Sequence, residues 1–214
     1  VLLEPSAVAV DVARGAIYVS DTQHHRVRRI DRETGTISTV AGTGDSGFSG
    51  DGADALLARL HLPRGVAVDV AGDLYIADTN NRRVRRVRIA DGSHAIETVA
   101  GGGLREVDGF LAVDVDLVSP QGVAVDGNGN LYVVETHAHR VRKVARDSGL
   151  IETVAGMGAP GFLGDGALAG AAMLNGPEAV AVDSHGNLFV ADTRNRRVRR
   201  VDALSKNIST VESF

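Results

Sequence analysis

The sequence predicts an all-β protein, a β-propeller built from four-stranded antiparallel blades. The first observation is a Val-Ala-Val-Asp segment that occurs four times in the same register, ending at Asp11, Asp69, Asp126 and Asp183. The second is that each copy holds four short runs rich in Val, Ile and Tyr, with no long helical pattern between them. Four-stranded units in series are typical of propellers, because each small sheet buries its faces against its neighbours.

The strands are clearest in the second copy, where the runs cover residues 66–69, 74–77, 83–87 and 96–100. Gly and Asn residues separate these runs, and both residue types favour tight turns. The repeat predicts a single propeller domain over residues 1–214. Its blades are expected at approximately residues 3–42, 62–101, 118–156 and 174–211.

Long connections follow the fourth run of each copy. The first and third carry Gly-Phe-Ser-Gly-Asp-Gly (47–52) and Gly-Phe-Leu-Gly-Asp-Gly (161–166), which predict tight turns, whereas the second lacks Gly-Asp-Gly. Residues 53–60 are expected to form one or two helical turns that place Leu56, Leu57 and Leu60 on one side.

Composition narrows the function classes. The 214-residue chain has a formal net charge of -4 and 43% hydrophobic residues, as expected for a globular protein. It contains no cysteine, which excludes disulfides, thiolate metal sites and thiol catalysis. Its apolar runs are far shorter than the roughly 20 residues of a membrane helix, so no membrane insertion is expected.

Closure of the ring is left open by the sequence. The chain begins at Val1 and ends after a fourth run, so it is expected to be a closed four-blade ring, half of a ring completed by a second copy, or part of a larger propeller. Exposed Val and Ile faces on the end blades predict a homo-oligomer, because uncovered apolar sheet faces are adhesive.

These motifs resemble the NHL-repeat β-propellers. The resemblance is carried by Val-Ala-Val-Asp, by Gly-Asn/Asp-Leu-Tyr/Phe, and by Asn-x-Arg-Val-Arg-Arg-Val at 81–87 and 195–201. Thr-Val-Ala-Gly and the Gly-Phe-Ser-Gly-Asp-Gly turn are similar to the long-repeat bacterial and teneurin-type NHL proteins. The resemblance covers residues 3–211 and implies a propeller fold. Members of this family bind very different partners, so it implies no particular ligand.

Charges that recur in every copy are expected to be structural. Asp21, Asp78, Glu135 and Asp192 hold one repeat position, and a single catalytic site does not use symmetry-related copies equally. We expect the three Asp residues to accept backbone N–H bonds in the turn to the third strand. The Arg-rich third strands are expected to cover apolar area and pair with carboxylates.

Residues that break the repeat are the better candidates for function. The candidate ligand-binding residues are Arg64, Gln121 and Glu178 just ahead of the first strands, and His24, His25, His137 and His139 in the turns between the second and third strands. The histidines suggest a transition metal or a group that titrates near neutral pH. Alternate copies face away from each other in a small ring, so solvated turn histidines are favoured.

The favoured function is a non-catalytic binding scaffold that presents its rim loops to a protein or a small ligand. No phosphate loop, nucleophile elbow or His-Glu-x-x-His motif occurs, so no catalytic residue and no cofactor are assigned. A metal-dependent lyase or hydrolase is the alternative, with zinc or with calcium on Asp45, Asp51, Asp54 or Asp165. RNA binding through the Arg strands is a second alternative, disfavoured by the pI of about 6.0 and by the absence of aromatic residues there.

Overall fold

The computed structural model describes residues 1–213, which form four antiparallel sheets of four strands each. The first two blades are β1 (Pro5–Asp11), β2 (Ala16–Asp21), β3 (Arg26–Asp31) and β4 (Ile37–Ala41), then β5 (Pro63–Val68), β6 (Leu74–Asp78), β7 (Arg83–Val87) and β8 (Ile96–Gly101). The other two are β9 (Pro120–Val125), β10 (Leu131–Glu135), β11 (Arg140–Val144) and β12 (Ile151–Ala155), then β13 (Ala179–Val182), β14 (Leu188–Asp192), β15 (Arg197–Val201) and β16 (Ile208–Ser213).

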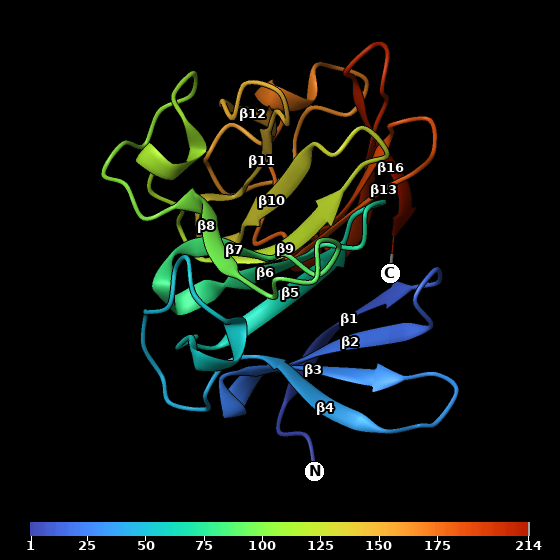
Figure 1. Ribbon diagram of the computed structural model, residues 1–214. Helices are drawn as coiled ribbons and strands as arrows, with labels where there is room; N and C mark the ends of the chain where they lie inside the picture. Colours follow the sequence, from blue (N-terminus) through green and yellow to red (C-terminus); the bar gives the residue numbers. More distant parts are fainter. Residues whose placement is uncertain (214) are drawn as a thin grey trace.

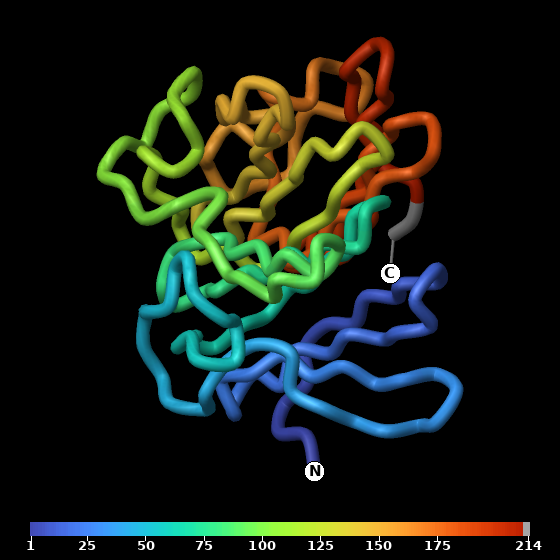
Figure 2. The backbone as a smooth tube through the Cα atoms, in the orientation of Figure 1, coloured from blue at the N-terminus to red at the C-terminus, as the bar shows by residue number. Residues whose placement is uncertain are grey.

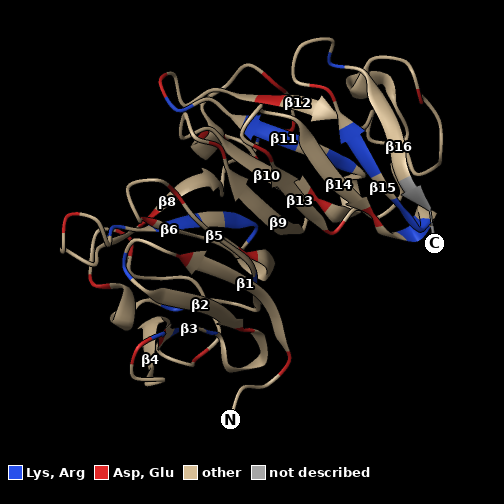
Figure 3. Cartoon of the chain, turned by 90° about the vertical axis from the view of Figure 1, so that its right-hand side faces the viewer, with Lys and Arg blue, Asp and Glu red and all other residues tan. Residues whose placement is uncertain are grey.

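The four sheets are the blades of a β-propeller, as the sequence predicts. Every blade is a simple meander whose strand order follows the chain, and the blades succeed one another around a common axis (Figure 1). The first strands line this axis, since β1 packs on β5, β5 on β9 and β9 on β13. Among the described residues no comparable packing joins β13 to β1, and Figure 3 shows the first and last blades apart.

Each blade interface encloses its own apolar core, because alternate residues of a strand face opposite neighbours. In β6, Leu74 and Ile76 pack in the core between the first and second blades. Tyr75 and Ala77, from the same strand, pack in the core between the second and third blades. Both faces of an inner blade are therefore buried, which explains why its strands read as nearly continuous apolar runs.

The turns between the second and third strands share one design. Each is a short 3-10 turn: η1 (Thr22–His24), η3 (Thr79–Asn81), η5 (Thr136–Ala138) and η7 (Thr193–Asn195). Each is followed by a residue in the left-handed conformation, namely His25, Arg82, His139 and Arg196, with φ between 51° and 56°. This conformation directs the chain from one strand into the next and sets where these four side chains point.

The connectors between blades are irregular apart from one 3-10 turn each: η2 (Ala55–Leu57), η4 (Ala112–Asp114) and η6 (Ala169–Ala171) (Figure 2). The prediction that Leu56, Leu57 and Leu60 lie on one side of a helical turn is wrong. Leu60 is buried, whereas Leu56 and Leu57 are exposed, because the single 3-10 turn directs Ala55 and Ala58 inward instead. A residue period drawn from an α-helix does not apply to so tight a turn.

The end blades expose residues that inner blades bury. Val8 of β1 is 61% exposed, while Val66 of β5 and Val123 of β9, at the same repeat position, are 6% and 7% exposed. In the inner blades this position packs against the preceding blade. The first blade therefore presents an uncovered apolar face. No helix among the described residues is long and apolar enough to cross a membrane.

Candidate functional site

The recurring acidic residue ties the start of each blade to its second strand. Asp78 is fully buried and accepts a hydrogen bond from the backbone N–H of His61 at 2.7 Å. Equivalent bonds run from Leu3 to Asp21, from Val118 to Glu135 and from Asn175 to Asp192. The prediction that these Asp residues accept backbone N–H bonds from the turn to the third strand is wrong. The N–H donor lies ahead of the first strand of the blade. A sequence-local turn rule does not reveal a partner 17 or 18 residues away.

A buried arginine completes this arrangement in three blades. Arg85 is fully buried, with one guanidinium nitrogen 3.5 Å from Asp78 and another 2.6 Å from Asp51 of the preceding connector. Arg142 joins Glu135 to Asp108, and Arg199 joins Asp192 to Asp165, with matching geometry. We call each such set an arginine clamp. A buried charge requires partners of opposite sign, and the clamp supplies two.

The connectors add a stacking contact to the clamps. The Arg83 and Arg85 guanidinium groups lie 3.9 Å and 4.8 Å from the ring centre of Phe48. Phe162 receives Arg197 and Arg199 in the same way at 4.1 Å and 4.8 Å. The Gly-Phe-x-Gly-Asp-Gly segments therefore hold the arginines of the next blade, through the ring and through the Asp carboxylate.

The clamps account for the buried arginines of the third strands. Figure 3 shows basic residues along β11 and β15, inside the sheets. Arg85, Arg142 and Arg199 are fully buried, and Arg86 pairs with Glu97. Two of the four Asp residues considered for calcium are engaged in the clamps, since Asp51 binds Arg85 and Thr98, and Asp165 binds Arg199 and Thr210.

Two of the four candidate histidines, His25 and His139, link neighbouring blades. Nδ1 of His25 accepts a hydrogen bond from the backbone N–H of Leu62 at 3.2 Å, and Nδ1 of His139 accepts one from Gly176 at 3.0 Å. An accepting ring nitrogen is unprotonated. Burial, followed by neighbouring positive charge, lowers the pKa of both histidines, which favours this neutral form.

The structure does not gather the four histidines at one point. His24 bonds to Asp21 of its own turn, and His137 is exposed in the third blade. His25 instead faces His61 of the next connector, with ring centres 5.6 Å apart. Within residues 1–213, no group of three or more His, Asp or Glu side chains is placed to hold a metal ion.

Arg64, Gln121 and Glu178 do come together, around a cavity of ≈ 320 Å³ at the start of the first strands. We call it the axial cavity. Its lining comes from all four blades and consists of Ser6, Ala7, Val8, Arg64, Gly65, Val66, Gln121, Gly122, Val123, Glu178, Ala179 and Val180. Ser6 was not predicted, although it precedes Val8 by the same spacing that separates Arg64 from Val66.

Two glycines allow the strands around the axial cavity to approach closely. A Cβ on Gly65 would lie 2.2 Å from the backbone oxygen of Gln121, and a Cβ on Gly122 would lie 2.7 Å from that of Glu178. Real Cβ atoms do not tolerate such distances, so any other residue would separate β5, β9 and β13. The glycines therefore bring the polar residues of three blades to one opening.

The polar groups at this opening are mutually different and largely unengaged. Ser6 donates to the backbone oxygen of Arg64 at 3.3 Å and shares a hydrogen bond with Thr22. The side chains of Arg64, Gln121 and Glu178 form no hydrogen bond or ion pair with any other described residue. The axial cavity therefore offers a cation, an amide, a carboxylate and a hydroxyl to a ligand.

Comparison with protein families gives a consistent assignment. The teneurin NHL domain matches residues 4–107 and 70–161, and the NHL repeat matches residues 174–200. Mouse teneurin-1 is 33% identical over 96% of this chain, and the chain spans 8% of teneurin-1.

Solved structures show the same fold in proteins of different kinds. An auxiliary nutrient binding protein from Bacteroides ovatus superposes with a TM-score of 0.68 at 22% identity, covering 97% of this chain and 48% of its own. Virginiamycin B lyase from Staphylococcus aureus gives 0.59 at 14% identity, covering 96% of this chain and 54% of its own. At these identities the similarity shows the fold alone.

Proposed function

This chain belongs to the NHL-repeat family, with the teneurin NHL domain, and we propose that it is a non-catalytic binding scaffold whose ligand occupies the axial cavity. One observation carries the proposal. The arginine clamps join the blades to the connectors through ion pairs. In contrast, the side chains of Arg64, Gln121 and Glu178 line a cavity and form no hydrogen bond or ion pair with any described residue. Polar groups that converge on a cavity without internal partners are typical of ligand recognition.

The polar residues of the axial cavity favour a ligand that carries a positive group, a negative group and an amide. The Arg64 guanidinium donates in a fixed fork that matches a carboxylate, and Glu178 accepts from an ammonium or guanidinium group. Gln121 both donates and accepts, as peptide groups require. A short segment of a protein partner, or a small zwitterionic ligand, carries all of these groups.

The proposal is tested by selecting random heptapeptides displayed on phage against the 214-residue protein. Binders are expected to lose affinity by about tenfold or more in Arg64→Glu and in Glu178→Lys, because each variant replaces an attraction with a repulsion. The control is Arg32→Glu, which makes the same charge change on an exposed residue of the β3–β4 turn.

Two outcomes would contradict the proposal. One is a set of binders that is equally affected by Arg32→Glu and by Arg64→Glu, which would indicate a general charge effect. The other is the absence of any binder that depends on Arg64, Gln121 or Glu178.

A further inference from the structure

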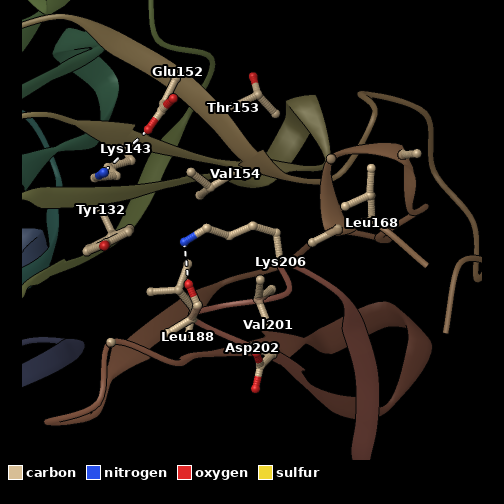
Figure 4. A pocket seen from close by; sticks show the side chains of 15 residues that line it. Tyr132, Lys143, Glu152, Thr153, Val154, Leu168, Leu188, Val201, Asp202 and Lys206 are labelled. Carbon is tan, nitrogen blue, oxygen red and sulfur yellow. Dashed lines mark hydrogen bonds and ion pairs between the residues drawn. The ribbon is translucent and has the colours of Figure 1, made fainter. Parts of the chain in front are cut away.

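A second cavity lies away from the axis, in the groove between the third and fourth blades (Figure 4). We call it the inter-blade pocket. Its volume is ≈ 430 Å³, within the range of small-molecule sites. Its apolar lining includes Val154, Leu188 and Val201, while Lys143 and Lys206 supply ammonium groups.

Three departures from the repeat coincide at this pocket. The first is Lys143, which stands where the other blades have Arg29, Arg86 and Arg200. Arg86 extends to Glu97, and Arg200 extends to Asn187 and Asp202. The tyrosine hydroxyl bonds to the Asp that follows the first strand in both inner blades, Tyr75 to Asp69 and Tyr132 to Asp126. Lys143 reaches only Glu152, at 3.4 Å.

The second departure is the small pair Gly170–Ala171 in η6. The corresponding residues are Leu56–Leu57 in η2 and Val113–Asp114 in η4, all of them larger side chains. Gly170 and Ala171 line the inter-blade pocket, and a Cβ on Gly170 would meet no atom within 4 Å. This connector therefore places no bulky side chain at a position where the η2 connector has the half-exposed Leu56.

The third departure is Lys206, in the turn between β15 and β16. It adopts a φ of 61°, where the first and third blades place Gly35 and Gly149 and the second blade places His94. A non-glycine residue in the left-handed region costs about 1 kcal/mol, so Lys206 occupies a backbone conformation that suits glycine better. Its backbone carbonyl accepts a hydrogen bond from the N–H of Ala169 at 2.9 Å, and Lys206 lines the pocket.

The charge balance in the pocket leaves one cation uncompensated. Lys143 faces Glu152, and the carboxylate of Asp202 is engaged by Arg200 and by the backbone and hydroxyl of Ser205. The Lys206 ammonium donates only to the backbone oxygen of Ala203, with no carboxylate at ion-pair distance among the described residues. Figure 4 shows its side chain lying across the pocket between Val154 and Leu188.

We infer that the inter-blade pocket binds a small amphipathic carboxylate, with its chain on Val154, Leu188 and Val201 and its carboxylate on Lys206. The apolar lining excludes a highly charged ligand, and the uncompensated ammonium selects a single negative charge. This site is separate from the axial cavity, which shares none of its lining residues.

The probe is octanoate, measured by isothermal titration calorimetry at pH 7, with octylamine and 1-octanol as charge controls. Lys206→Gly removes the ammonium and suits the left-handed backbone, so the fold is retained while octanoate affinity falls about tenfold. Gly170→Leu adds a bulky side chain to the lining of the pocket and is expected to abolish binding. Its matched control is Gly127→Leu, on the β9–β10 turn, where a Cβ also meets nothing within 4 Å.

Saturable octanoate binding that is lost in Gly170→Leu, weakened in Lys206→Gly and unchanged in Gly127→Leu supports the inference. No saturable binding of octanoate overturns it. Equal binding to Gly170→Leu overturns it too, because the octanoate would then lie elsewhere, such as on the exposed face of the first blade. Octylamine binding as tightly as octanoate overturns the assignment to a carboxylate.

Discussion

At the scale of single residues, the fully buried arginines show how one sequence motif serves the fold. The single side chain of Arg85 pairs with Asp78 of its own blade and with Asp51 of the preceding connector. Burial, the largest influence, raises the pKa of Asp78 even though Asn81, His61 and Arg85 donate to it. The main contribution of each guanidinium to stability is therefore to compensate the charge of a buried carboxylate.

Replacing Arg85 by methionine should destabilise the protein by about 3 kcal/mol, because Asp78 is left buried without a cation. The measurement is the free energy of unfolding from urea denaturation followed by circular dichroism. Arg88→Met is the control, since Arg88 pairs with Glu97 at the surface, where solvent screens the ion pair and its loss costs far less. An equal loss in both variants would show that the clamp has no special role.

At the scale of elements, the strands followed from the sequence more closely than the connectors did. Alternating apolar residues and turn glycines placed β6 and β7 almost to the residue. β5 begins at Pro63, ahead of the predicted Val66, because a bulge between these residues extends the pairing to Asp78. A proline and a bulge both mask a strand from pattern recognition.

The connectors were harder because their contacts are distant in sequence. Asp108 was missed, since the second connector lacks Gly-Asp-Gly, yet Asp108 binds Arg142 at 2.7 Å as Asp51 binds Arg85. The repeat register contained this signal. The repeat register singled out Arg64, Gln121 and Glu178, which line one cavity and stay a prediction as ligand-binding residues. It did not reveal that His25 and His139 bond to the following blade.

The connector clamp at Asp165 should show a defined pH dependence. Burial raises the pKa of Asp165, but hydrogen bonds from Thr210 and the Arg199 charge outweigh this effect and lower it below 3.8. A lowered pKa in the folded state adds stability above pH 3.8, and this stability is lost as the pH falls through the folded value.

Asp165→Asn should therefore be less stable than the wild type by about 1 kcal/mol at pH 7, a modest value because the carboxylate is partly exposed. The difference should vanish in urea titrations carried out well below pH 3.8. Asp45→Asn serves as the control, since Asp45 is 73% exposed and its contact with Arg59 is 3.7 Å long. A difference that persists well below pH 3.8 would contradict the ionic role.

At the scale of the whole molecule, the interfaces between blades set what the propeller exposes. Each inner blade buries two faces, but the outer face of β1 carries Val8 and Val10 at 61% and 52% exposure. Exposed valines in one strand form a continuous apolar strip, which monomeric proteins usually avoid. The blade design is the same throughout, so this face has the shape that in β5 and β9 receives a neighbouring blade.

The 214-residue polypeptide should therefore self-associate through the first blade. Light scattering after size exclusion is expected to give an apparent mass that rises above 22.3 kDa with concentration. Val8→Ser combined with Val10→Ser should shift this rise to concentrations about tenfold higher or more, because each buried valine contributes about 1.5 kcal/mol or more. Leu104→Ser, on a residue that is 97% exposed in a connector, should leave it unchanged. A constant mass of one chain at every concentration would contradict the prediction and would mean that the apolar strip of β1 is stable in water.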